Sequence, residues 1–218
     1  MKRPAGHIAC ELRRFWRDQR GAAMLEYALV LPLFLLIFFA LVDFGRYGSD
    51  FVMTQKAMER GARVAVVRPP ACAGVPATHT RPAQQPGGTA PSRFGTPCRL
   101  GGVCANPGTI SCGLDLSDGT ASEIWDRIRN VVPNTVRPED VTISYAFDER
   151  LGFLGGPYVP LVTLELTGAS FDFVTPLAGL AALAVPGNQT GSELGGRVAF
   201  PNMSVTLPAE DLAVGSAG

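Results

Sequence analysis

The chain has 218 residues, with 19 Lys and Arg against 19 Asp and Glu, so its formal net charge is zero. That balance gives no reason to expect a nucleic-acid partner, and the length fits one domain or one domain with an appendage. Charge placement is more informative, because six of the 19 basic residues lie in the first 20 positions. Residues 1–21 are therefore predicted to form a basic leader.

An apolar run follows the leader. Residues 27–42 contain no charged side chain, and with the preceding flank they form a 22-residue stretch interrupted only by Glu26. A helix needs about 20 apolar residues to cross the hydrocarbon core of a bilayer. A cleaved secretory signal is disfavoured, since its apolar region is shorter and ends in a small-residue site that is missing after Val42. The run predicts a single membrane span. The basic flank predicts a cytoplasmic N-terminus.

The same helix is expected to continue beyond the span, over residues 22–67 in all. Its second half becomes amphipathic, and apolar residues recur there at helical spacings, at Phe44, Tyr47, Phe51, Met58, Ala62 and Ala65. Such a stripe favours packing against a globular head. Arg68-Pro69-Pro70 is expected to end the helix, because proline has no amide hydrogen to donate.

Residues 68–119 are rich in Pro and Gly and are expected to form a loop region. They contain four of the five cysteines, Cys72, Cys98, Cys104 and Cys112, whereas Cys10 lies in the leader. Four cysteines on the oxidising side of a membrane favour two disulfides, with three possible pairings. A zinc site is the less favoured alternative, because there is no C-x-x-C pair and His79 is the only histidine beyond the span.

Residues 120–207 are predicted to form an α+β head, and residues 208–218 a flexible tail. A second helix is expected over 121–132, with Thr120 and Glu123 as a capping box. Alternating apolar residues over 141–147 predict a strand, and further strands are expected at 161–166, 171–174 and 197–207, the last broken at Pro201. The apolar patch 176–185 is too short to span. The fold class is therefore α+β, with a small antiparallel sheet.

Glu26 is the residue that most requires a chemical explanation. A carboxylate inside a membrane-entering helix costs about 2.5–3.5 kcal/mol at mid-membrane and less near the interface. If the chain were cut after Gly21, the new α-ammonium of Ala22 would lie four residues before Glu26, on the same helix face. The carboxylate would then neutralise its own ammonium or that of a neighbouring subunit. The alternative is an interfacial glutamate that reaches water beside Arg20.

A family resemblance bears on this choice. Gly21, four intervening residues and Glu26-Tyr27, placed between a basic leader and an apolar span, resemble the prepilin-peptidase site of Tad-type pilins and pseudopilins. More specifically, four segments resemble the TadE-like family: the entry to the span at 17–32, Asp43-Phe44-Gly45-Arg46 at its end, Glu59-Arg60-Gly61-Ala62-Arg63-Val64-Ala65 after it, and Phe173-Val174-Thr175-Pro176-Leu177 near the C-terminus. The resemblance is specific over about residues 17–67 and thin beyond them.

The resemblance implies a minor pilin or assembly factor of a Tad-type, type IVb-like (Flp) pilus. By that reading, Gly21 precedes the scissile bond, Ala22 becomes the N-terminus, Glu26 is the recognition and assembly carboxylate, and Tyr27 is its companion. The implied partners are the lipid bilayer, a prepilin peptidase, other pilins or pseudopilins and Tad inner-membrane assembly proteins. The implied location is the bacterial inner membrane, with a single pass, a cytoplasmic N-terminus and a periplasmic C-terminal domain, or the pilus itself.

Nothing in the sequence suggests an enzyme. His7 lies in the leader, and His79 lies in a Pro- and Thr-containing loop, where a lone histidine is expected to be solvated rather than catalytic. There is no G-x-S-x-G motif and no phosphate-binding loop of the Walker type. We therefore expect no catalytic residue, no metal and no cofactor. The alternative function is that of an unprocessed, signal-anchored envelope protein with a periplasmic binding domain.

Overall fold

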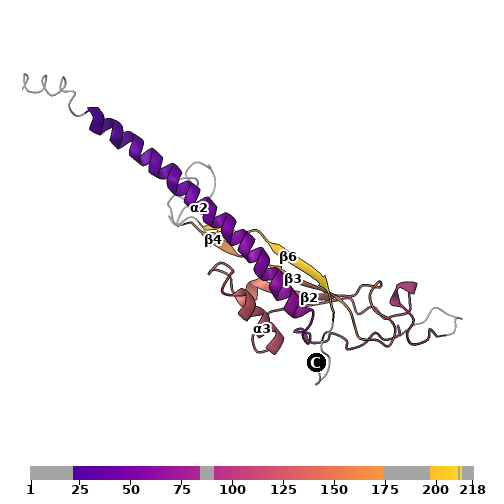
Figure 1. Ribbon diagram of the computed structural model, residues 1–218. Helices are drawn as coiled ribbons and strands as arrows, with labels where there is room; N and C mark the ends of the chain where they lie inside the picture. Colours follow the sequence, from indigo (N-terminus) through magenta and orange to yellow (C-terminus); the bar gives the residue numbers. More distant parts are fainter. Residues whose placement is uncertain (1–21, 84–90, 174–196, 211, 213–218) are drawn as a thin grey trace, which may run out of the picture.

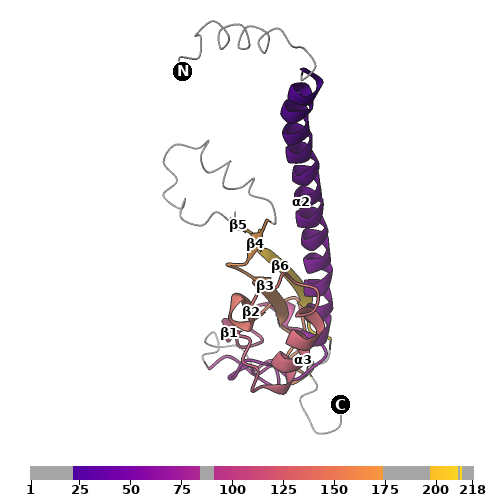
Figure 2. The same ribbon diagram turned by 90° about the vertical axis from the view of Figure 1, so that its left-hand side faces the viewer.

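The computed structural model describes residues 22–83, 91–173, 197–210 and 212. Its dominant element is helix α2, Ala22–Ala65, which at 44 residues is about 66 Å long. The head packs only on the C-terminal half of this helix, and the N-terminal half projects away from it (Figures 1 and 2). The predicted continuous helix is thus confirmed, and it ends two residues earlier than expected.

The head is an antiparallel sheet with α2 and a second helix packed against it (Figure 2). Its four strands lie in the order β1-β2-β3-β6, where β1 is Thr109–Gly113, β2 is Val141–Ala146, β3 is Leu161–Leu166 and β6 is Met203–Pro208. A separate two-stranded ribbon pairs β4, Ser170–Asp172, with β5, Arg197–Ala199. The predicted α+β class is therefore correct.

The inner face of the sheet and the stripe on α2 form what we call the main core. Val141, Ile143 and Tyr145 of β2 alternate inward, as their period of two predicts, and all three are fully buried. From α2, Met58, Ala62 and Ala65 meet them without measurable exposure. The predicted stripe therefore continues into the core, whereas Phe44 at its start remains 66% exposed.

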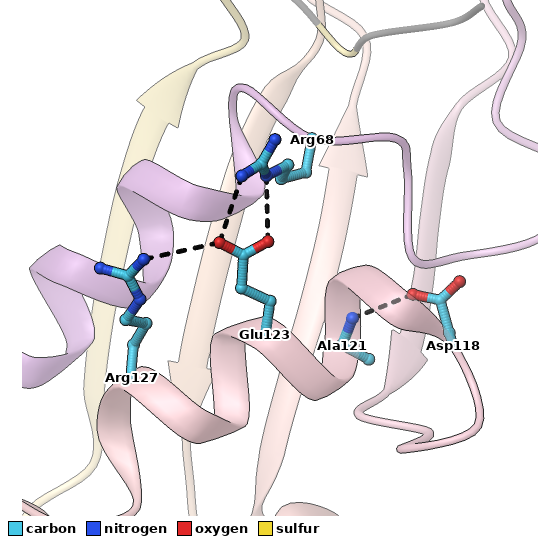
Figure 3. A network of polar contacts seen from close by, with 5 residues as sticks. All are labelled: Arg68, Asp118, Ala121, Glu123 and Arg127. Atoms are coloured by element: carbon cyan, nitrogen blue, oxygen red, sulfur yellow. Dashed lines mark hydrogen bonds and ion pairs between the residues drawn. The ribbon is translucent and has the colours of Figure 1, made fainter. Parts of the chain in front are cut away.

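The second helix, α3, is shorter than predicted and has a different cap. It spans Gly119–Ile128, and the Asp118 carboxylate accepts a hydrogen bond from the Ala121 amide at 2.9 Å. The predicted capping box of Thr120 and Glu123 is wrong, because Thr120 is buried and Glu123 points away toward α2. There Glu123 accepts hydrogen bonds from Arg68 and pairs with Arg127, which joins the end of α2 to α3 (Figure 3).

Three further boundaries differ from the sequence prediction. Residues 109–113, expected within a loop, form the edge strand β1 and pair with β2. The interrupted run over 197–207 forms two strands in different sheets, β5 and β6, on either side of Pro201. Ala209 and Leu212, expected in a flexible tail, are both buried. The leader and the apolar patch 176–185 lie outside the described residues.

A second, smaller cluster forms what we call the loop lobe, made of segments 77–83, 91–108 and 147–160. Its centre is Leu154, which is fully buried against Val103 and the disulfide cysteines of this lobe. Backbone hydrogen bonds hold it together: the His79 amide donates to Gly156 O, and the Gly155 amide donates to His79 O. The lobe lies at the end of the head farthest from the N-terminal half of α2 (Figure 1).

Candidate functional site

The N-terminal half of α2 is the part of the molecule that its own head leaves uncovered. Every side chain described from Met24 to Val42 is exposed, apart from the half-buried Ala40. The helix is long and apolar enough to cross a membrane. An apolar helix that is bare on all sides needs lipid or other helices to cover it. This half of α2 therefore needs contacts with lipid or with helices outside its own head.

The predicted processing and assembly residues lie at the start of this bare half. Ala22 begins α2, and Glu26 follows one turn later, exposed and carrying the only charge between residues 24 and 42. Tyr27, next to it, is 67% exposed. Gly21 lies outside the described residues. Helical geometry thus places residue 26 one turn from residue 22, as the charge-pair hypothesis requires, but it does not test cleavage.

At the other end of the bare half, Asp43-Phe44-Gly45-Arg46 forms the junction with the head. The Asp43 carboxylate is buried and lies 3.7 Å from the Arg46 guanidinium. Arg46 also sits over the ring of Phe171, 5.7 Å from its centroid. Arg46, Asp50, Asp172 and Phe173 contribute to the walls of an open cleft of about 390 Å³ between α2 and β4. These residues fix the ribbon beside the point where α2 leaves the head.

An aromatic cluster joins the ribbon to this junction. The Tyr47 ring meets the Phe171 ring edge-on at 5.3 Å between centroids and contacts Phe200 at 5.9 Å. Phe173 lies 6.0 Å from Phe44 and 6.5 Å from Tyr47. Sequence reasoning found the helical half of this cluster through its spacing. The partners on the ribbon were missed, because three-residue strands carry too little periodicity to predict where they pack.

Gly61 explains the small-residue motif after the span. A Cβ atom at this position would lie 2.9 Å from Leu164 Cδ2, which is closer than real Cβ contacts, and 3.1 Å from Ile128 Cγ2, which is tighter than most of them. Ala62 and Ala65 beside it are buried against the same surface. The motif is thus a close-approach surface, on which α2 lies directly against α3 and β3.

The four cysteines beyond the span form two disulfides, as predicted, and the structure supplies the pairing. Cys72 bonds to Cys112, which joins the segment after α2 to strand β1. Cys98 bonds to Cys104 within the loop lobe. A sulfur atom in a disulfide has no thiolate to offer a zinc ion. This holds even though His79 Nδ1 or Nε2 and the sulfurs of Cys98 and Cys104 lie within 4.8 Å of one another.

His79 is not the solvated loop residue that its sequence context predicts. The side chain is buried, its Nε2 accepts a hydrogen bond from the Val159 amide at 3.2 Å, and its ring lies 5.0 Å from that of Tyr158. Burial lowers the pKa of His79, because the charged imidazolium loses water. Gly152 at φ +74° leaves room for the ring, since a Cβ there would collide with it. The histidine is a structural part of the loop lobe.

Together, the fold and the junction define a protein that has, among its described residues, one candidate membrane-spanning helix and a disulfide-braced α+β head. Residues 21–63 match the family model of TadE-like proteins, which confirms the resemblance over the span and the first part of the head-packing helix. The match indicates a protein associated with the Tad pilus. No curated protein and no solved structure matches the chain.

Proposed function

We propose that this protein is a minor pilin or assembly factor of a Tad-type pilus that is cleaved by a prepilin peptidase and packs through the N-terminal half of α2. The observation that carries the proposal is the combination of the TadE-like match over 21–63 with a helix half that its own head leaves bare. A purely anchoring helix needs only to be apolar, whereas this one carries Glu26 in its second turn.

Cleavage after Gly21 gives Glu26 a defined electrostatic role. The α-ammonium of Ala22 and the Glu26 carboxylate would lie one helical turn apart, at the end of α2 where the helix dipole favours negative charge. In lipid an unpaired charge is penalised, so a neighbouring subunit that offers its ammonium to Glu26 gains stability by docking. The protein would act through this packing and not by catalysis.

The orientation belongs to the same proposal. The six basic residues before the span favour a cytoplasmic leader, which puts the head in the periplasm of a bacterial inner-membrane protein. The two disulfides of the head support this location, because disulfides persist in an oxidising compartment. The proposed partners are the prepilin peptidase, other pilins or pseudopilins and the Tad inner-membrane assembly proteins.

The deciding experiment is the intact mass of the membrane-extracted chain, from cells with and without the prepilin peptidase. A chain that begins at Ala22 only when the peptidase is present supports the proposal. A chain that keeps its leader under both conditions would refute processing and leave an unprocessed, signal-anchored envelope protein.

The assembly role is tested separately with Glu26→Ala. This variant should still insert into the membrane but fail to support pilus assembly, because the carboxylate that pairs with the ammonium is gone. Glu59→Ala is the matched control, since it removes a carboxylate from the same helix where it pairs with Lys56 on the surface of the head region. Normal piliation with Glu26→Ala would sink the assembly role.

A further inference from the structure

The ribbon β4–β5 lies at the height of the helix where a bilayer must end. If the apolar span begins at Ala22, then 20 residues of helix cover the hydrocarbon core and the span ends near Val42. The first charged residue after Glu26 is Asp43, directly beyond this point. Phe44 and Tyr47 follow, about 3 and 8 Å farther along the helix axis.

This height falls within the headgroup layer. A bilayer is about 30 Å thick in its hydrocarbon core and about 40–45 Å with its polar regions, so each polar layer is roughly 5–8 Å deep. Phe44 and Tyr47 contact Phe173, directly after β4, at 6.0 and 6.5 Å between ring centroids, and Tyr47 also contacts Phe171 of β4 at 5.3 Å. Because the ribbon contacts the helix at that height, the ribbon lies there too.

The ribbon presents exposed apolar side chains at this position, together with the exposed Asp172. Val198 of β5 is 38% exposed, Ala199 beside it is exposed, and Phe44 on the helix is 66% exposed. Figure 2 shows β4 and β5 as the described part of the head nearest to the bare half of α2. Aromatic rings at a membrane boundary are typical of groups that lie at headgroup level, and apolar surface there can be buried at the boundary between headgroups and acyl chains.

From this geometry we propose that the ribbon β4–β5 is a second membrane-contact surface, which lies in the headgroup layer beside the span and holds the head against the bilayer. The occupant is the lipid surface on which α2 emerges, because the ribbon is continuous with the span through Phe44, Tyr47 and Phe173. The inference rests on the proposed membrane span. It goes further, since an anchor alone would allow the head to stand away from the lipid.

The test measures which positions lie close enough to the bilayer for bromine on the upper part of the acyl chains to quench a tryptophan. Full-length protein in which Trp16 and Trp125 are replaced by Phe is reconstituted in bilayers of phosphatidylcholine or of brominated phosphatidylcholine, which quenches tryptophan on contact. Single tryptophans are then introduced as L36W in the span, V198W on the ribbon and L100W in the loop lobe. All three positions are exposed in the described structure, so the new rings displace no core residue. Intact disulfides and an unchanged helical circular dichroism signal establish that each variant is folded.

The expected result is loss of fluorescence in brominated lipid for L36W and V198W, and none for L100W. If L36W is quenched while V198W stays as bright as L100W, the ribbon contact is wrong and the span survives. If L36W itself is not quenched, the span is wrong and this inference falls with it. Equal quenching of V198W and L100W would also overturn the proposal, because contact would then not be specific to the ribbon.

Discussion

The main core and the loop lobe belong to the same head but are stabilised in different ways. In the main core, α2, α3 and the four-stranded sheet bury a continuous set of apolar side chains. Among the described residues of the loop lobe, the buried cluster consists of Leu154, Val103 and the disulfide-bonded pair Cys98 and Cys104, and the rest of the order comes from a buried histidine and hydrogen bonds between loops. The contrast teaches that packing stabilises the part of the head nearest the candidate span, whereas local links stabilise the part farthest from it.

Removing each disulfide in turn should produce the largest difference. Cys72 and Cys112 are 40 residues apart, and loss of this bond by Cys72→Ser with Cys112→Ser should cost about 4 kcal/mol by loop entropy. Cys98 and Cys104 are 6 apart, and the corresponding double variant should cost about 2 kcal/mol. Urea unfolding of the full chain in detergent, followed by Trp125 fluorescence, measures both. An equal loss of unfolding free energy for the two double variants would mean that native packing, not chain entropy, determines how much each disulfide stabilises the protein.

The close approach at Gly61 should show how tightly the main core is packed. Gly61→Val forces its side chain against Leu164 and Ile128, which should destabilise the protein by about 1–3 kcal/mol. Gly48→Ala is the control on the same helix, where nothing lies within 4 Å of an added Cβ. It should stabilise by about 0.5–1 kcal/mol through helix propensity. The same unfolding experiment measures the free energy of unfolding of both variants. An unchanged free energy of unfolding for Gly61→Val would show that the core is packed less tightly than described.

The smallest effect is expected from pH in the loop lobe. The pKa of His79 in the folded protein is lowered from about 6.5 by burial, so the unfolded chain binds the proton more readily. The stability that neutral His79 contributes is therefore fully present above pH 6.5, and it is lost as the pH falls from there toward the lower folded value.

His79→Gln should flatten this dependence when unfolding is compared at about pH 7.5 and pH 5.5, on either side of the unfolded pKa. The leader variant His7→Gln, measured on chain that still carries its leader, serves as the control and should retain the pH dependence of the free energy of unfolding. An unchanged slope in His79→Gln would assign the pH dependence to other groups.

The elements that could be predicted from the sequence are those whose apolar residues repeat with a regular period. The helix over 22–65, the inward residues of β2 and the strand at 161–166 each repeat a pattern over several turns or pairs, and all are found in the structure. Strand β1 was missed because its five residues contain only Ile110 and Cys112 as inward side chains. The cap of α3 was misassigned because Asp118 and Thr120 are both good cap residues, and only tertiary burial of Thr120 decides between them.

The candidate site was predictable to a different extent at its two ends. Gly21, Ala22, Glu26 and Tyr27 form a local motif that sequence alone suggests, and their role stays a prediction. The cysteine pairing, the burial of His79 and the aromatic junction depend on residues that are far apart in the chain, such as Tyr47 and Phe171, and no local pattern encodes such contacts. Their positions follow only from the assembled fold.

The helical geometry of α2 also fixes the direction in which Glu26 points. Glu26 and Phe44 are 18 residues apart, which is five turns at 3.6 residues per turn, so the two lie on the same face of the helix. Phe44 is in contact with the head through Phe173. Glu26 therefore points to the side of α2 on which Phe44 contacts the head, and a subunit that pairs with this carboxylate would approach the helix from that side. Inserting one residue between them would turn the carboxylate by about 100° away from that side while leaving both ends chemically intact.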